Sequence, residues 1–388
     1  MVSLAAAFAP AARAVESSGR FEFAPVVEVP EAGDARRLRA MLGFGTGYDS
    51  NPGRADDAAR DSDGLVNMAG GVSLIGGNSR LRYSAATEAR ARRFFDRDDF
   101  DFEELVLRGK ALFATQRLRL GLGASHALRA DPVDVDELFF PLLERSETVL
   151  APEAELTMGG AVLGVGYRSA IADYDKATLS YLDHTDSWTS LDLSWGRAGA
   201  SRYFVRLETG GVDYDVFDVA HPRVDFDRDR IYAGLRTPTE SRQSLELGLG
   251  YFAVDGAPSG DDEGLFATVR TTRLFGEGSS ALELAYVRDA EASATAEFKT
   301  ASRVVVRYAR KVNMLWNWSA GYRAQFADLT GPDVPAEDSI AYHALDFGVG
   351  RALGSPGRWR GRLHAGTRME FGDDFDRVVL TVGADLVR

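Results

Sequence analysis

The chain has 388 residues, 40 glycines, no cysteine and a formal net charge of -13. The missing cysteine excludes a disulfide framework and cysteine-based metal sites, and the acidic balance argues against nucleic acid as a general partner. A chain of this length forms two or three soluble domains or one large all-β domain, and glycines spread along it above the usual ~7% favour many strands and turns.

The first residues have features of an export signal. An apolar run over residues 2–9 is followed by a small-x-small pattern at 12–14, which is typical of signal-peptide cleavage sites, although the basic start of such a signal is missing. We expect a signal peptide at 1–14 and a periplasmic segment at 15–35; an Ala-rich tail is the alternative. No later stretch contains the roughly 20 apolar residues that a membrane-spanning helix needs.

From residue 36 onward, apolar residues recur at every second position, which is typical of β-strands. In the stretch MLWNWSAGYRAQF, for example, Trp316 and Trp318 take one face while Arg323 takes the other. The pattern predicts an all-β chain of about 18 strands, or 16 if weak strands near 148–171 are misassigned. The predicted strands span residues 36–49, 65–76, 79–92, 102–114, 117–127, 148–158, 161–171, 187–196, 201–213, 229–237, 242–254, 263–274, 280–289, 298–311, 314–327, 339–352, 358–371 and 377–388.

The connections between the predicted strands alternate in length. Those after even-numbered strands are short, such as GGNS after the second strand and TQ after the fourth. Those after odd-numbered strands are mostly longer, such as 50–64, 128–147 and 214–228. Strict alternation is typical of transmembrane β-barrels, which have tight periplasmic turns and longer external loops. The sequence therefore predicts a single transmembrane antiparallel up-and-down β-barrel over 36–388, located in the outer membrane.

The two strand faces differ in polarity as such a barrel requires, with an apolar face for lipid and a polar face for an aqueous lumen. A charge on the lipid face at the midplane costs about 2–4 kcal/mol. We therefore expect the outward charges Arg93, Arg273 and Arg351 to lie near strand ends, where long side chains reach the interface. Aromatic residues near strand ends, such as Tyr48 and Trp188, are expected to form interfacial girdles.

The first predicted strand ends in the segment GYDSNP, residues 47–52. This segment resembles the start of a loose set of Gram-negative outer-membrane β-barrels, which includes porin-like barrels and, more loosely, the barrel domain of surface lipoprotein assembly modifiers. The resemblance implies an outer-membrane location rather than an activity. The chain departs from this set in two ways: no helical repeat domain precedes the first strand, and Arg388 stands where such barrels usually end in an aromatic residue.

The glycines just before this segment, in GFGTG, also resemble half of a phosphate-binding loop. Such a loop requires a helix after it, so that backbone N–H groups face the phosphates. Here an acidic, loop-like segment follows instead. We therefore interpret Gly43, Gly45 and Gly47 as the lumen side of the first strand, with Tyr48 at the membrane edge.

Basic residues gather on the predicted inner face. An 18-stranded barrel is wide enough for an aqueous channel, and rings of Arg favour the passage of anions. The sequence therefore predicts a porin-like channel for anionic solutes or an anionic polymer such as exopolysaccharide. In one alternative, the arginines pair with lumen carboxylates and only stiffen the wall. In another, the chain is a non-conducting assembly or scaffold barrel for export of a surface polymer or lipoprotein. The predicted lumen and selectivity residues are Arg206, Arg303, Arg307, Arg323, Arg360, Arg362 and Arg368.

The connection at 129–147 contains an unusual apolar run. An exposed loop of this kind would be a liability, so we expect it to fold into the lumen as a constriction or to dock on a partner. A short helix or strand packed on neighbouring loops is the alternative. The predicted constriction residues are Leu138, Phe139, Phe140, Leu142 and Leu143.

The sequence gives weak support for an enzyme. It contains no G-x-S-x-G motif, and its five histidines are scattered. We predict no catalytic residue, metal site or cofactor, leaving His126, His184 and His343 as the candidates of an enzymatic alternative. Acidic runs in the external connections could hold divalent cations shared with lipopolysaccharide, or be simply solvated. The predicted partners are outer-membrane lipid and lipopolysaccharide, the barrel assembly machinery and, in the export alternative, a periplasmic protein docking on 15–35.

Overall fold

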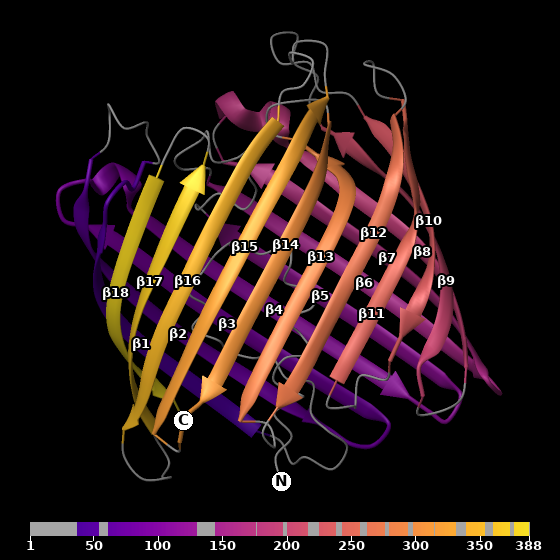
Figure 1. The fold of residues 1–388 in the computed structure, drawn as a ribbon, viewed down its shortest axis with the longest axis horizontal. Helices are drawn as coiled ribbons and strands as arrows, with labels where there is room; N and C mark the ends of the chain where they lie inside the picture. Colours follow the sequence, from indigo (N-terminus) through magenta and orange to yellow (C-terminus); the bar gives the residue numbers. More distant parts are fainter. Residues whose placement is uncertain are drawn as a thin grey trace.

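The described residues form one closed barrel of 18 antiparallel strands, in which β1 lies between β2 and β18 (Figure 1). This confirms the all-β, up-and-down fold with 18 strands rather than 16. The computed structural model describes residues 37–53, 61–129, 144–175, 177–196, 200–215, 225–237, 243–256, 262–275, 279–293, 298–313, 315–330, 339–353, 360–372 and 376–387.

Every predicted strand is present, and the predicted ends differ from the observed ones by three residues at most.

Within the described ranges, no helix is long and apolar enough to cross a bilayer. In the part of the connections that the structure describes, there are two short 3-10 helices, η3 (Asp98–Phe100) and η5 (Ala177–Leu182). The strands are β1 (Arg37–Asp49), β2 (Asp63–Gly77), β3 (Leu81–Phe94), β4 (Phe102–Ala114), β5 (Leu118–Arg129), β6 (Arg145–Met158), β7 (Ala161–Tyr174), β8 (His184–Gly196), β9 (Arg202–Tyr214), β10 (Phe226–Arg236), β11 (Gln243–Asp255), β12 (Asp262–Phe275), β13 (Ser280–Ala292), β14 (Phe298–Lys311), β15 (Trp316–Thr330), β16 (Ser339–Leu353), β17 (Arg360–Gly372) and β18 (Asp376–Val387).

The two ends of the barrel differ in the length of their connections. At one end, residues 115–117 join β4 to β5 and residues 159–160 join β6 to β7. At the other end, residues 50–62 join β1 to β2 and residues 215–225 join β9 to β10. We call these the short-turn end and the long-loop end; in Figure 1 the short-turn end lies at the bottom, together with the C-terminus. The predicted alternation is therefore confirmed.

Side chains alternate between an exposed outer face and an inner face along each strand. On β1, Leu42 and Phe44 are exposed, whereas Met41 and Asp49 are buried on the inner side. Large apolar side chains stay exposed in this way on every strand except β13 and β14, whose outward apolar side chains are half-buried. A bilayer offers no water to satisfy backbone polar groups, so strands cross it only as a closed barrel with an apolar outer face. The chain therefore has the closed sheet and the apolar outer face of a barrel that spans a membrane.

The outward charges lie at strand ends, as expected. Arg93 is next to the last residue of β3 and pairs with Glu103. The guanidinium of Arg273 lies 4.9 Å from the ring centre of Phe275, at the end of β12. Interfacial cation–π contacts of this kind keep the charge near the headgroups while the stem stays in hydrocarbon.

The predicted girdle residue Trp188 is placed wrongly by the sequence pattern. Trp188 is buried and lies on the inner face of β8, while Leu191 and Leu193 on the same strand are exposed outside. Because side chains alternate strictly, Trp188 shares the inner parity of Asp186 and cannot face lipid. Its position near the predicted strand start was also misleading, since β8 begins three residues earlier, at His184.

The GYDSNP segment joins the first and last strands at the long-loop end. The Ser50 N–H donates to the Val378 carbonyl at 2.9 Å, and the Val378 N–H donates to Ser50 Oγ at 2.7 Å. The Asn51 side chain donates to the Asp376 carbonyl at 3.3 Å. Asp49 is fully buried and accepts a hydrogen bond from Arg377 Nε at 2.9 Å. The segment therefore seals the seam where the barrel closes.

Candidate functional site: the charged lumen wall

Ion pairs between neighbouring strands form the inner wall of the barrel. They fall into three groups of strands, which we name the β15–β1 network, the β7–β13 cluster and the β3–β6 group. Each forms because the period-two pattern puts charged residues on the inner parity of adjacent strands, where cross-strand neighbours lie about 4.5–5.5 Å apart.

The β15–β1 network starts at a carboxylate shared by two guanidiniums. Arg323 on β15 donates through Nη2 to Asp346 Oδ2 at 3.2 Å, and Arg368 on β17 donates through Nε to Asp346 Oδ1 at 2.8 Å. Gly321 lies opposite Asp346 in the register, and because it has no side chain, the side chains of Asp346 and Arg307 lie over its Cα. Two guanidiniums therefore share one carboxylate at this height of the wall.

The same network continues across the seam. Arg368 Nη1 lies 3.8 Å from Glu370, which accepts a hydrogen bond from Arg377 Nη1 at 3.2 Å, and Arg377 in turn donates to Asp49 on β1. The Glu370 and Arg377 side chains are almost fully buried. Breaking one partner of a buried pair costs about 3–5 kcal/mol, so this part of the wall is rigid.

The β7–β13 cluster combines arginines with aromatic rings. The guanidiniums of Arg228 and Arg230 lie 4.2 and 3.7 Å from the ring centre of Trp188. Arg230 also pairs with Glu208 at 3.0 Å and with Asp289 on β13. Stacked, paired guanidiniums of this kind are held in place and largely neutralised.

Arg206 belongs to this cluster as well. Its Nε donates to Asp192 Oδ2 at 3.0 Å, and its Nη1 donates to the Tyr232 hydroxyl at 3.1 Å. Asp192 also pairs with Arg236, whose guanidinium lies 4.3 Å from the ring centre of Phe204. Arg206 is therefore paired. Among the predicted lumen residues, Arg303 on β14 follows it in the sequence and lies five strands away in the barrel.

An apolar core lies behind these ion pairs on the inner wall. Because its members are buried, the paired arginines above them, such as the partly exposed Arg206 and Arg236, are the groups that face the lumen at these strands. The core consists of Phe204, Val212, Phe226, Tyr232, Phe252, Val254, Phe266, Ala290 and Phe298.

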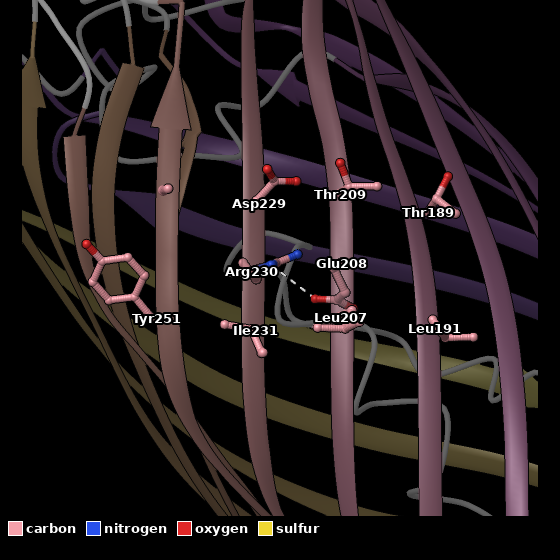
Figure 2. Close-up of a pocket in the computed structure, with 10 residues that line it drawn as sticks. Thr189, Leu191, Leu207, Glu208, Thr209, Asp229, Arg230, Ile231 and Tyr251 are labelled. Carbon is pink, nitrogen blue, oxygen red and sulfur yellow. Dashed lines mark ion pairs between the residues drawn. The ribbon is translucent and has the colours of Figure 1, made fainter.

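Figure 2 shows the Arg230–Glu208 pair where β9 and β10 lie side by side. Leu207 and Ile231, their sequence neighbours, are exposed and therefore lie on the outer face. They line a cavity of about 310 Å³ together with residues of β8 and β11. Glu208 and Arg230 themselves also contribute to the lining of this cavity.

The β3–β6 group is more open. Lys110 lies 4.0 Å from Glu153, and Arg119 lies 3.4 Å from Glu155 in a pair that is about half exposed. Arg108, two residues before Lys110 on the inner face of β4, is exposed, and no carboxylate of the described residues lies within 4.0 Å of it. This wall therefore carries a guanidinium that is not neutralised.

The predicted lumen residues do not form a single set. Arg307, Arg323 and Arg368 lie close together on β14, β15 and β17, and Arg303 lies on the same inner face of β14. Arg362 lies nearer the short-turn end, where its Nη2 donates to Asn317 Oδ1 at 3.5 Å. Arg206 is in the β7–β13 cluster. Arg360 is on β17, but its side chain is outside the described part of the chain.

Several partners escaped the sequence analysis. Asp192 pairs with both Arg206 and Arg236, and the guanidiniums of Arg228 and Arg230 lie on the ring of Trp188. Each of these residues alternates with outward residues on a predicted strand, and this pattern could have placed it on the inner face. The pattern does not show which residues of neighbouring strands lie opposite, because that depends on the register.

The predicted constriction residues at 138–143 lie outside the described residues. Another connection does narrow the long-loop end: Leu182 of η5 and the adjacent Tyr181 pack against Tyr174 and Ala172 on the inner face of β7. Asp183 follows η5 and accepts the Tyr174 N–H at 2.7 Å. Burial raises the pKa of Asp183, with the charges of nearby aspartates adding to the shift.

The histidines of the enzymatic alternative are dispersed. His126 Nδ1 lies 2.9 Å from Thr148 Oγ1 on the outer face, and His343 Nδ1 lies 2.9 Å from the Tyr322 hydroxyl, also outside. His184 Nδ1 lies 2.7 Å from the Leu182 carbonyl oxygen. Within the described ranges, no three His, Asp or Glu side chains are grouped so that they could hold a metal ion.

No protein-family model matches the chain, and no curated protein matches it. Solved structures with a similar fold include Pseudomonas aeruginosa OccK2 (OpdF), with a TM-score of 0.44, 12% identity and coverage of 90% of this chain and 98% of that one. Acinetobacter baumannii OccAB4 has a TM-score of 0.46 and 9% identity, over 92% and 98% of the two chains. The FrpB iron transporter of Neisseria meningitidis has a TM-score of 0.46 and 8% identity, over 92% and 81%. With similarity this low, the membrane-spanning barrel is inferred from the strands and outer face of this chain itself.

Proposed function

We propose that the chain is a porin-like outer-membrane channel whose lumen prefers anionic solutes or an anionic polymer. One observation carries the proposal: two inward, exposed arginines, Arg108 and Arg362, have no carboxylate of the described residues within ion-pair distance. A guanidinium that faces an aqueous lumen without a counter-charge attracts anions and repels cations. The paired arginines, such as Arg206 and Arg368, contribute much less to this field.

An assembly or scaffold barrel that does not conduct is the second candidate. The buried core of the β7–β13 cluster favours it, because packed side chains fill part of the inner wall there. A polymer such as an acidic polysaccharide needs a continuous path, whereas a scaffold does not. The two candidates therefore differ in whether water connects the two ends of the barrel.

Reversal potentials in planar bilayers under a salt gradient test the proposal. We expect the native protein to conduct with anion preference, and the double variant Arg108→Gln, Arg362→Gln to lose most of that preference. The variant Arg273→Gln is a matched control, since it removes one arginine from the outer face. Cation preference in the native protein would contradict the anion channel. A correctly inserted barrel without conductance would favour the scaffold.

A further inference from the structure

A groove of about 910 Å³ crosses the outer face of β2–β7. Its floor is one row of cross-strand neighbours, because each residue pairs in register with the next. Five interstrand spacings of about 4.8 Å make this row about 24 Å long. The floor residues are Leu74, Ala85, Gly109, Ala124, Leu150 and Ser169.

The middle of the groove is deep because its floor residues are small. Ala85, Gly109 and Ala124 stand in adjacent strands, and a Cβ atom added to Gly109 would meet no other atom within 4 Å. Exposed larger side chains, such as Leu107 and Tyr167, form the walls. The groove is therefore open, narrow and apolar along most of its length.

A polar pair lies on the wall of this groove. His126 and Thr148 are cross-strand neighbours on β5 and β6, and His126 Nδ1 lies 2.9 Å from Thr148 Oγ1. Polar side chains on a lipid-facing surface are costly unless they find partners. The remaining imidazole nitrogen and the hydroxyl lone pairs are available for a further polar group.

The groove climbs toward the long-loop end of the barrel. Ala85 is four residues beyond the start of β3, whereas Ser169 is eight residues beyond the start of β7, and both strands start at the short-turn end. His126 is three residues before the end of β5, near the long loops. The polar pair therefore lies toward the headgroups of the leaflet on the long-loop side, while the apolar floor runs into the hydrocarbon.

We propose that this groove binds one acyl chain of a membrane lipid, with the His126–Thr148 pair hydrogen-bonded to the lipid's ester or headgroup. The groove is continuous with the lipid-facing surface of the barrel, so hydrocarbon is the medium that reaches it. Its width of one residue row fits a single extended chain. The convex outer wall of a second barrel would rest on Leu107 and Tyr167 and leave the floor unfilled. This binding site is independent of the proposed channel function.

The test uses the full chain in phosphatidylethanolamine vesicles that contain a small share of lipid with a diazirine in the middle of one acyl chain. After illumination, mass spectrometry locates the adducts. We expect adducts to concentrate on peptides from β4–β6, and to fall several-fold there in Ala124→Leu. The matched control is Ala233→Leu, at an exposed outward position of β10 outside the groove; we expect it to leave the β4–β6 labelling unchanged.

Gly109→Leu is a second groove-filling variant, since the space above Gly109 accommodates a side chain. Gel electrophoresis of unheated and heated samples checks that each variant folds, because a folded barrel changes its mobility when heating unfolds it. Labelling spread evenly around the barrel, or unchanged in both groove variants, would overturn the proposal. Cross-links between two copies at β4–β6 would overturn it as well, because they would identify the groove as a contact between barrels.

Discussion

At the scale of single residues, the buried arginine at the seam should matter far more than an exposed one. Arg377 lies between Asp49 and Glu370, which are both almost fully buried. Arg377→Gln leaves two buried carboxylates without a cation, and we expect it to lower the free energy of unfolding by about 3–5 kcal/mol. Urea unfolding in detergent micelles, followed by tryptophan fluorescence, measures this loss.

Arg119→Gln is the control for this substitution. Arg119 pairs with Glu155 at 3.4 Å, but both side chains are about half exposed. Solvated pairs contribute about 0–1 kcal/mol, so this variant should unfold nearly as the native protein does. Equal losses in Arg377→Gln and Arg119→Gln would show that the seam network contributes no special stability.

At the scale of secondary-structure elements, η5 should respond to pH through Asp183. The folded state raises the pKa of this carboxyl by burial, so the folded state holds its proton more tightly than the unfolded state does. The contribution of Asp183 to stability is therefore present below its ordinary pKa, near about 3.9, and is lost as pH rises through the raised value. Asp173, Asp215 and His184 are the other charged or titratable groups that act on it.

Hydrogen exchange of residues 174–184, corrected for the intrinsic pH dependence, measures this effect. We expect protection in the native protein to fall between pH 4 and pH 7. Asp183→Asn keeps an acceptor for the Tyr174 N–H but removes the charge, so its protection should change less with pH and exceed that of the native protein at pH 7. The same pH dependence in both proteins would assign the effect to other groups.

The strands were predictable from the sequence, whereas the contacts between strands were not. Strands such as β14, predicted at 298–311 and observed at Phe298–Lys311, follow from period-two alternation, which is a local property. The sharing of Asp346 by Arg323 and Arg368 follows from the register between β15, β16 and β17, which many local patterns allow. Charged residues on the inner face were therefore predictable, whereas their pairing was not.

This difference explains why one of the seven predicted lumen arginines lies apart. Arg206 has the same inner parity as Arg323, but its neighbours supply Asp192, Glu208 and Tyr232. Conversely, Arg108 received no special weight from its sequence, because the sequence does not reveal that neighbouring strands offer it no carboxylate. Whether a lumen arginine is neutralised is thus a property of the assembled sheet.

At the scale of the whole molecule, the lumen should be asymmetric. The buried core of β9–β14 covers one side of the inner wall, while Arg108 on β4 and Arg362 on β17 are exposed on the other strands. Anions should therefore move along the wall that runs from β15 through β1 to β6, where these two guanidiniums have no paired carboxylate. The chain contains no cysteine, so single-cysteine variants report the accessible wall without background.

We expect Arg108→Cys and Arg362→Cys to react rapidly with a small charged methanethiosulfonate reagent, because both positions face water. Val254→Cys, on the inner face of β11 but fully buried in the core, should react much more slowly. In bilayers, a negatively charged reagent on Arg108→Cys should lower anion preference further, and a positively charged reagent should restore it. If Val254→Cys reacts as fast as Arg108→Cys, the core side of the lumen is open to water, and the asymmetric path is wrong.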